Sequence, residues 1–159
     1  MIQINVVAVG RIKEKFLREG IDEYAKRLSP LVRLRVKETR EEPFPANFSA
    51  AQKEQLLLKE GRRLINLANG DGYPIALDVD GETLSSPELA GCITSLANTG
   101  EKITFLIGGP LGISNEVKSF AKRRLSFSAL TFTHQMARLI LFEQIYRAIK
   151  ISRGEKYHW

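Results

Sequence analysis

The chain has 159 residues, of which 43% are hydrophobic and 26% are charged, so we expect one globular domain over residues 1–159. Cys92 is the only cysteine, which excludes an internal disulfide and a cysteine-based zinc site and favours a reducing compartment. Since no apolar run approaches 18 residues, we expect a cytoplasmic protein without a membrane partner.

The net charge of +6 is distributed unevenly along the chain. Residues 1–117 contain 15 basic and 16 acidic residues, whereas residues 118–159 contain nine basic and two acidic residues. Such an asymmetry predicts that one face binds a polyanion. A solvated helix face followed by a basic tail would explain it equally well.

Strand and helix patterns alternate through the first half. The run "IQINVVAV" (2–9) predicts a buried strand, and helical spacing of apolar residues over 14–28 predicts a helix. The alternating "VRLRVKE" predicts a half-exposed edge strand. After the proline-containing loop "EEPFPANFS", Ser49 is expected to cap a helix that reaches about Ala68.

The second half repeats this alternation. "YPIALDV" and "KITFLI" predict strands, and Ser86-Pro87-Glu88 predicts a helix start with Ser86 as its cap. Ser114 is expected to cap a short helix through about Lys122, and a last helix is expected over about 133–152. The whole pattern indicates an α/β fold with a mostly parallel sheet flanked by helices.

Ligands of open α/β sheets bind at the carboxyl ends of the strands, and three such ends stand out. They are "IALDVDG", "TFLIGGPLG" and "LSFSALTF". The second carries Gly108, Gly109 and Gly112 but neither the lysine of a P-loop nor the dinucleotide fingerprint. Its glycines fit backbone contacts to a nucleotide-like ligand or, equally, a tight turn.

The segment "LSFSALTF" (125–132) combines small hydroxyl side chains with apolar ones. Apolar walls and backbone hydrogen-bonding groups are what an adenine ring requires. By pattern alone, a short core strand with one polar face is the favoured interpretation.

The sequence gives no support for covalent or metal-assisted chemistry. Cys92 lies inside a predicted helix, and no serine occurs in a G-x-S-x-G elbow. With two histidines and no clustered carboxylates, we expect no metal site. A reaction that depends mainly on positioning fits better.

The last helix is apolar on most of its surface, which predicts that it packs on the sheet and also on a second subunit. The tail "SRGEKYHW" that follows mixes cations with aromatic rings. This mixture suits phosphate contacts and base stacking, although a frayed end would look the same.

The segments "INVVAVGRIKEKF", "FLIGGPLG" and "LSFSALTFTHQMARLILFEQIYRAIKISRGEKYH" together resemble the RlmH family of SPOUT-class methyltransferases. The similarity covers essentially the whole chain. It implies a C-terminal trefoil knot that binds S-adenosylmethionine, a homodimer without a metal, and methylation of N3 of a pseudouridine in 23S rRNA on the assembled ribosome. The alternative is a non-catalytic ribosome- or RNA-binding protein that uses the basic C-terminal face.

The resemblance also assigns site residues. The cofactor-binding positions that it implies are Leu77, Gly108, Phe127, Ser128, Ala129, Leu130, Thr131 and Phe132. The catalytic positions that it implies are His134, Arg138, Arg153, Tyr157 and His158. Of these, His158 or Tyr157 in the tail is the first choice as proton acceptor and His134 the second, with Arg138 and Arg153 supplying positive charge. Helix-surface pairing is the simpler role for Arg138.

The chain departs from the family pattern at two positions. It has Thr133 where the family has proline, in "TFTHQ", and Trp159 where the family has a basic residue. Threonine remains a good helix cap, so we expect the last helix to begin normally.

Overall fold

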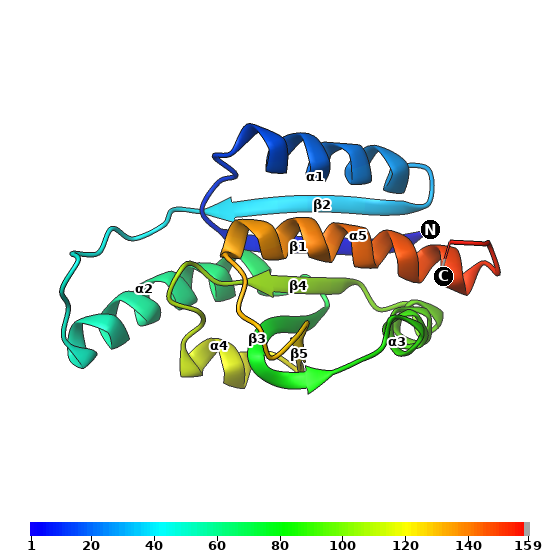
Figure 1. Ribbon diagram of the computed structural model, residues 1–159. Helices are drawn as coiled ribbons and strands as arrows, with labels where there is room; N and C mark the ends of the chain where they lie inside the picture. Colours follow the sequence, from blue (N-terminus) through cyan, green and yellow to red (C-terminus); the bar gives the residue numbers. More distant parts are fainter. Residues whose placement is uncertain (158–159) are drawn as a thin grey trace.

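The computed structural model describes residues 1–157, so the expectations for His158 and Trp159 lie outside the described residues. A five-stranded sheet forms the centre, in the order β2-β1-β4-β3-β5, and every neighbouring pair is parallel (Figure 1). The strands are β1 (Ile2–Val9), β2 (Val32–Thr39), β3 (Tyr73–Thr83), β4 (Ile103–Ile107) and β5 (Arg123–Ser126). The predicted α/β class and the edge position of β2 are confirmed.

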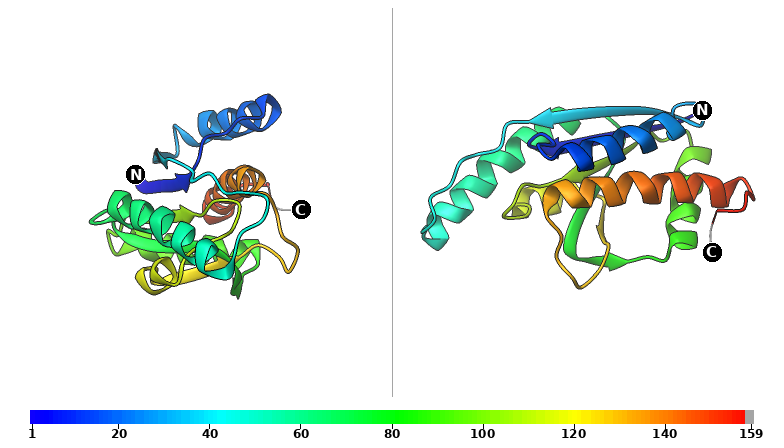
Figure 2. Two further views of the ribbon diagram at one scale, coloured as in Figure 1. Left: turned by 90° about the vertical axis from the view of Figure 1, so that its left-hand side faces the viewer. Right: turned by 45° about the horizontal axis from the view of Figure 1, so that its top comes forward.

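Helices cover both faces of the sheet, giving the three layers seen in Figure 2. Helices α1 (Lys15–Leu28), α3 (Ser86–Asn98) and α5 (His134–Ser152) bury their apolar residues in one core cluster. Helices α2 (Ala50–Ala68) and α4 (Asn115–Phe120) contribute to a smaller cluster on the opposite face. No helix within residues 1–157 is long and apolar enough to cross a membrane.

The helix starts follow the expected capping chemistry, with one correction. Ser49 forms a capping box with Gln52, and the Thr133 side chain accepts a hydrogen bond from the Met136 N–H at 3.1 Å. The expected cap Ser86 was wrong: Ser85 caps α3, and Glu88 returns a hydrogen bond to the Ser85 N–H at 2.7 Å. The reason is spacing, because Glu88 lies three residues after Ser85, as a capping box requires.

Strand β3 runs four residues beyond the expected "YPIALDV" and bends around β5. Leu125 pairs with Leu77 before the bend and with Glu82 after it. A side chain at Gly81 would lie 2.7 Å from the carbonyl group of Arg124, so only glycine permits this approach. Figure 1 shows the curled β3 ribbon with β5 beside it. The segment expected as one short core strand is therefore strand only to Ser126 and continues as a loop over 127–133.

Arg138 is not a surface residue. It is 3% exposed, pairs with the carboxylate of Glu38 at the end of β2, and donates to the Gly10 carbonyl at 2.9 Å. The alternative of helix-surface pairing does not apply, because Arg138 points from α5 towards the carboxyl ends of β1 and β2. Its charge is used within the fold, and it joins three segments that are far apart in the sequence.

Replacing Arg138 with leucine should lower the free energy of unfolding by about 2 kcal/mol, because Glu38 and the Gly10 carbonyl lose their buried partner. Urea denaturation followed by circular dichroism measures the change. The control is Lys15→Ala, whose side chain is 90% exposed and should have almost no effect. Equal stabilities of the two variants would contradict the structural role of Arg138.

Candidate functional site

A cavity of about 290 Å³ opens at the carboxyl ends of β3, β4 and β5. Residues 77–79, 107–113, 125–128 and 130–132 line it, together with His134 and Ala137. These are the three strand ends predicted to bind a ligand, and the structure brings all of them together.

The glycine loop forms one wall of the cavity. A Cβ on Gly108 would lie 2.4 Å from the Gly112 carbonyl oxygen, and Gly112 has a φ of +92°. The Gly112 N–H donates to the Gly109 carbonyl at 3.1 Å, so the loop folds back on itself. Only glycine fits at these positions, and the backbone of the loop therefore lies at the cavity wall.

The loop after β5 forms the opposite wall. Ser126 donates to the Ser128 carbonyl at 3.1 Å, and the Ser128 hydroxyl accepts from the Leu130 N–H at 3.0 Å. Leu130 and Phe132 remain 71% and 42% exposed at the cavity edge. The hydroxyl side chains thus order the loop from within, which leaves apolar surface for a ligand.

The cofactor-binding residues that the resemblance implies fall around this cavity, with one exception. The residues that line it are Leu77, Gly108, Phe127, Ser128, Leu130, Thr131 and Phe132. Ala129 is in the same loop but does not line the cavity.

The Asp78 carboxylate stabilises the bend of β3 next to the cavity. It is 9% exposed, accepts from the Asp80 N–H at 3.1 Å, and pairs with Arg124 of β5 at 3.0 Å. Lys118 of α4 approaches the same carboxylate at 3.8 Å. The cations around Asp78 come from segments that follow it in the chain, so this ion-pair cluster ties β3, α4 and β5 together.

Of the four expected catalytic residues within residues 1–157, only His134 lines the cavity. Its ring is half-buried at the start of α5, and burial lowers the pKa of the imidazole below its usual value. Glu41 acts in the opposite direction, while Arg138 and Lys13 lower this pKa further. A lowered pKa keeps the imidazole neutral at pH 7, the state that accepts a proton.

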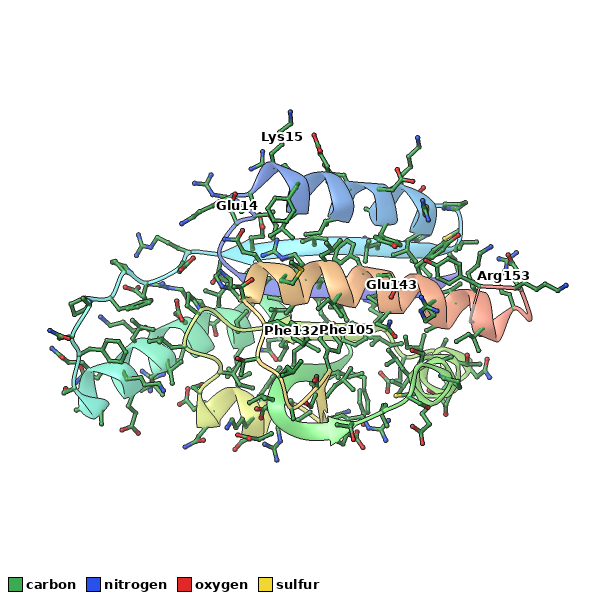
Figure 3. All side chains as sticks on the ribbon, viewed as in Figure 1. Glu14, Lys15, Phe105, Phe132, Glu143 and Arg153 are labelled. Atoms are coloured by element: carbon green, nitrogen blue, oxygen red, sulfur yellow. The ribbon has the colours of Figure 1, made fainter. Side chains whose placement is uncertain are left out.

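Arg153 and Tyr157 lie at the C-terminal end of α5, whereas the cavity is at its N-terminal end. With a rise of 1.5 Å per residue, α5 is about 27 Å long. Figure 3 shows Phe132 near one end and Arg153 near the other. The Tyr157 ring packs edge-on against Tyr146, with centroids 4.9 Å apart, and Arg153 pairs with Glu155 at 2.7 Å. One chain alone does not bring Arg153 or Tyr157 to the cavity.

Burial raises the pKa of Tyr157 to about 12 in this packed position. The phenol therefore stays protonated at neutral pH and does not act as a base where it lies.

Sequence reasoning missed three acidic residues and a glycine close to the cavity. Glu38 and Glu41 follow the expected edge strand, and Gly10 ends β1. Glu60 is 2% exposed, and its carboxylate lies beside Gly109 and accepts from the Glu42 N–H at 2.9 Å. A signal existed only for Glu60, which shares the buried spacing of Leu64 and Ala68 on α2.

A family model described as predicted SPOUT methyltransferase matches residues 2–158. The chain belongs to this family. It is 51% identical over 158 residues to the ribosomal RNA large subunit methyltransferase H of Carboxydothermus hydrogenoformans and 49% identical over 159 residues to that of Desulfitobacterium hafniense. In both alignments 99% of each chain is covered.

Solved structures agree on the fold. The TrmH/SpoU tRNA modifying enzyme of A. aeolicus aligns over 97% of this chain and 78% of its own, with a TM-score of 0.53 and 13% identity. The SpoU methyltransferase AviRb of Streptomyces viridochromogenes covers 98% of this chain and 62% of its own, with a TM-score of 0.50 and 14% identity. At such identities the likeness concerns the fold alone.

SPOUT methyltransferases use S-adenosylmethionine as methyl donor, and the cavity fits this molecule. Apolar side chains and the glycine-loop backbone suit an adenosine, and the cavity volume is near the lower end of small-molecule sites. No lysine or arginine is among its lining residues, so it does not repel a sulfonium. The described residues contain no group of three or more side chains placed to hold a metal ion.

Replacing Gly108 with alanine should weaken binding of S-adenosylmethionine at least roughly tenfold, because the new Cβ would collide with the Gly112 carbonyl and force the glycine loop (residues 108–112) open. Isothermal titration calorimetry measures the affinity. The matched control is Gly91→Ala on α3, where an added Cβ meets nothing within 4 Å. An unchanged affinity in Gly108→Ala would show that the loop does not contact the cofactor.

Proposed function

We propose that this protein methylates N3 of a pseudouridine in 23S rRNA on the assembled ribosome, in the cytoplasm, with S-adenosylmethionine as methyl donor. One observation carries the proposal. The three strand ends of this chain form a single nucleoside-sized cavity, in a sequence about half identical over its full length to proteins named ribosomal RNA large subunit methyltransferase H.

The chain's contribution is binding and alignment. Leu77, the backbone at Gly108 and the loop from Phe127 to Phe132 hold the adenosine between apolar walls. The donor supplies a methyl group on a sulfonium, which needs no metal and no covalent enzyme intermediate. Alignment of that methyl group with a ring nitrogen accounts for much of the rate acceleration in such a transfer.

We also propose the trefoil knot that the resemblance implies. A knot requires that one part of the chain pass through a loop formed by another. The bend of β3 supports this proposal, because Leu125 pairs with residues on both sides of it and Gly81 allows the close approach. After β5 the chain forms the loop 127–133 at the cavity and then enters α5.

A homodimer completes the proposal. Phe16 on α1 is 63% exposed, and Leu139 on the neighbouring face of α5 is only partly buried against Gly20. A second subunit on this apolar surface would bury it. Because Arg153 and Tyr157 lie far from the cavity of their own chain, their proposed role at the substrate requires the cavity of the partner. His158 extends the same tail and shares this proposed role.

The competing function is a non-catalytic protein that docks on ribosomes through its basic C-terminal residues. It predicts RNA binding without affinity for S-adenosylmethionine. Calorimetry with S-adenosylmethionine therefore separates the two functions before any RNA is added.

Deleting the gene should remove one methyl group from 23S rRNA, and the purified protein with S-adenosylmethionine should restore it on ribosomes from the deletion strain. Mass spectrometry of nuclease fragments locates the methyl group, and chemical probing of the nucleotide identifies the pseudouridine. The Gly108→Ala variant serves as the control with a damaged cofactor site. Methyl transfer to another nucleotide would refute the proposed specificity but not the methyltransferase activity.

Mixing Gly108→Ala and Tyr157→Ala chains tests whether the tail acts on the partner, at a concentration of S-adenosylmethionine that leaves the Gly108→Ala cavity unoccupied. If Gly108→Ala and Tyr157→Ala chains exchange freely, half of the dimers carry one of each. One site in every such dimer is intact, so activity should return to about one quarter of the wild-type value. A mixture that stays inactive after proven subunit exchange would place the tail at its own chain's site.

A further inference from the structure

Two buried polar groups without partners face each other beside the cavity. They are His134 Nε2 at the start of α5 and Glu41 Oε2 in the segment after β2, 3.7 Å apart. Buried polar atoms in native proteins normally have partners, so an unpartnered pair of opposite chemistry calls for an explanation. Figure 1 shows the start of α5 beside the ends of β1 and β2. Gly10, the residue after β1, lies next to both side chains.

We propose that Glu41 and His134 form a carboxylate–imidazole pair in which Glu41 orients the imidazole that accepts the N3 proton of the substrate. His134 would be the catalytic base and Glu41 its positioning residue. The inference rests on the proposed function and adds to it the identity of the proton acceptor.

The surroundings are arranged to keep this pair together. Gly10 has a φ of +83°, and a Cβ there would lie 2.9 Å from Glu41 Oε2 and 3.5 Å from His134 Nε2. Arg138 holds the Gly10 carbonyl at 2.9 Å. The Lys13 N–H donates to the side chain of Gln135, the residue after His134, at 3.0 Å. The segment after β1 is thus fixed against the start of α5, and its glycine leaves the space that the pair occupies.

Only a small movement of the two side chains is needed to form the hydrogen bond between Glu41 and His134. A gap of 3.7 Å is too short for an intervening water and about 0.8 Å longer than an ordinary hydrogen bond. In the closed pair Nε2–H donates to Glu41, which fixes the tautomer with a free lone pair on Nδ1. As the N3–methyl bond forms, the S–methyl bond breaks with its electron pair passing to sulfur, and the N3 proton moves to Nδ1. The imidazolium so formed faces the Glu41 carboxylate until the proton leaves to water.

The charged groups around the pair give it a distinct pH dependence. Glu41 raises the pKa of His134, whereas burial, Arg138 and Lys13 lower it. Glu60 faces Glu41 from α2, and burial together with Glu41 and Glu42 raises the pKa of Glu60. The imidazole must be neutral to accept a proton, so the rate should fall as the pH drops below the lowered pKa of His134. Removing the Glu41 charge lowers that pKa further.

The test compares Glu41→Gln and His134→Gln with wild type in single-turnover methylation of ribosomes over a range of pH. Glu41→Gln should reduce the plateau rate roughly tenfold and move the acid limb to lower pH, while its affinity for S-adenosylmethionine stays unchanged. His134→Gln should reduce the rate roughly a hundredfold and abolish that limb. Glu42→Gln is the matched control, because this neighbouring carboxylate pairs with Arg63 and does not face His134.

A merely structural pair would change the melting temperature and the rate but leave the acid limb in place, and that result overturns the proposal. So does a wild-type rate in His134→Gln. If the wild-type protein binds no S-adenosylmethionine and methylates no RNA, the proposed function itself fails. A wild-type enzyme that methylates a different ring nitrogen leaves the test of the pair intact.

Discussion

The bend of β3 around β5 is the constraint on which the rest of the structure depends. Because Leu125 pairs on both sides of the bend, β5 is held where its following loop faces the glycine loop after β4. Gly81 makes the approach sterically possible, and Asp78 stabilises the bend with Arg124. Without the bend, residues 127–132 would continue the edge of an ordinary sheet and the cavity would lose one wall.

Part of the basic excess of residues 118–159 has an internal explanation. Arg124 and Lys118 pair with Asp78, Arg123 pairs with Glu82, and Arg138 pairs with Glu38. The acidic partners belong to residues 1–117, so these ion pairs join residues 118–159 to the rest of the chain. Such pairing reduces the local positive field that would attract a polyanion, which weakens the argument for a protein that binds RNA by charge alone.

The sequence predicted the parts of the site that depend on short-range patterns. Alternating strands and helices predict a parallel sheet, and in such a sheet the strand ends meet at one edge, so the convergence of Leu77, Gly108 and Phe127 could be foreseen. The bend at Gly81 could not, because "VDGET" also fits an ordinary turn. The burial of Arg138 was hidden for a related reason. No local sequence pattern marks Arg138 as buried, and its partner Glu38 lies 100 residues away.

Cofactor binding and proton acceptance, the two parts of the proposed chemistry, also differ in how far they depend on short-range sequence patterns. The cofactor cavity is built from strand ends and their loops, so each wall has a local sequence signature. The proposed base depends on Glu41, Gly10 and Arg138, which meet only after β1, β2 and α5 have packed. A methyl transfer depends most strictly on the alignment of donor and acceptor. In the proposed site, the loops after β3, β4 and β5 hold the donor. A proton acceptor can reach its hydrogen-bonded position by a small side-chain movement. The proposed acceptor His134 and its partner Glu41 are less than 1 Å beyond hydrogen-bond distance.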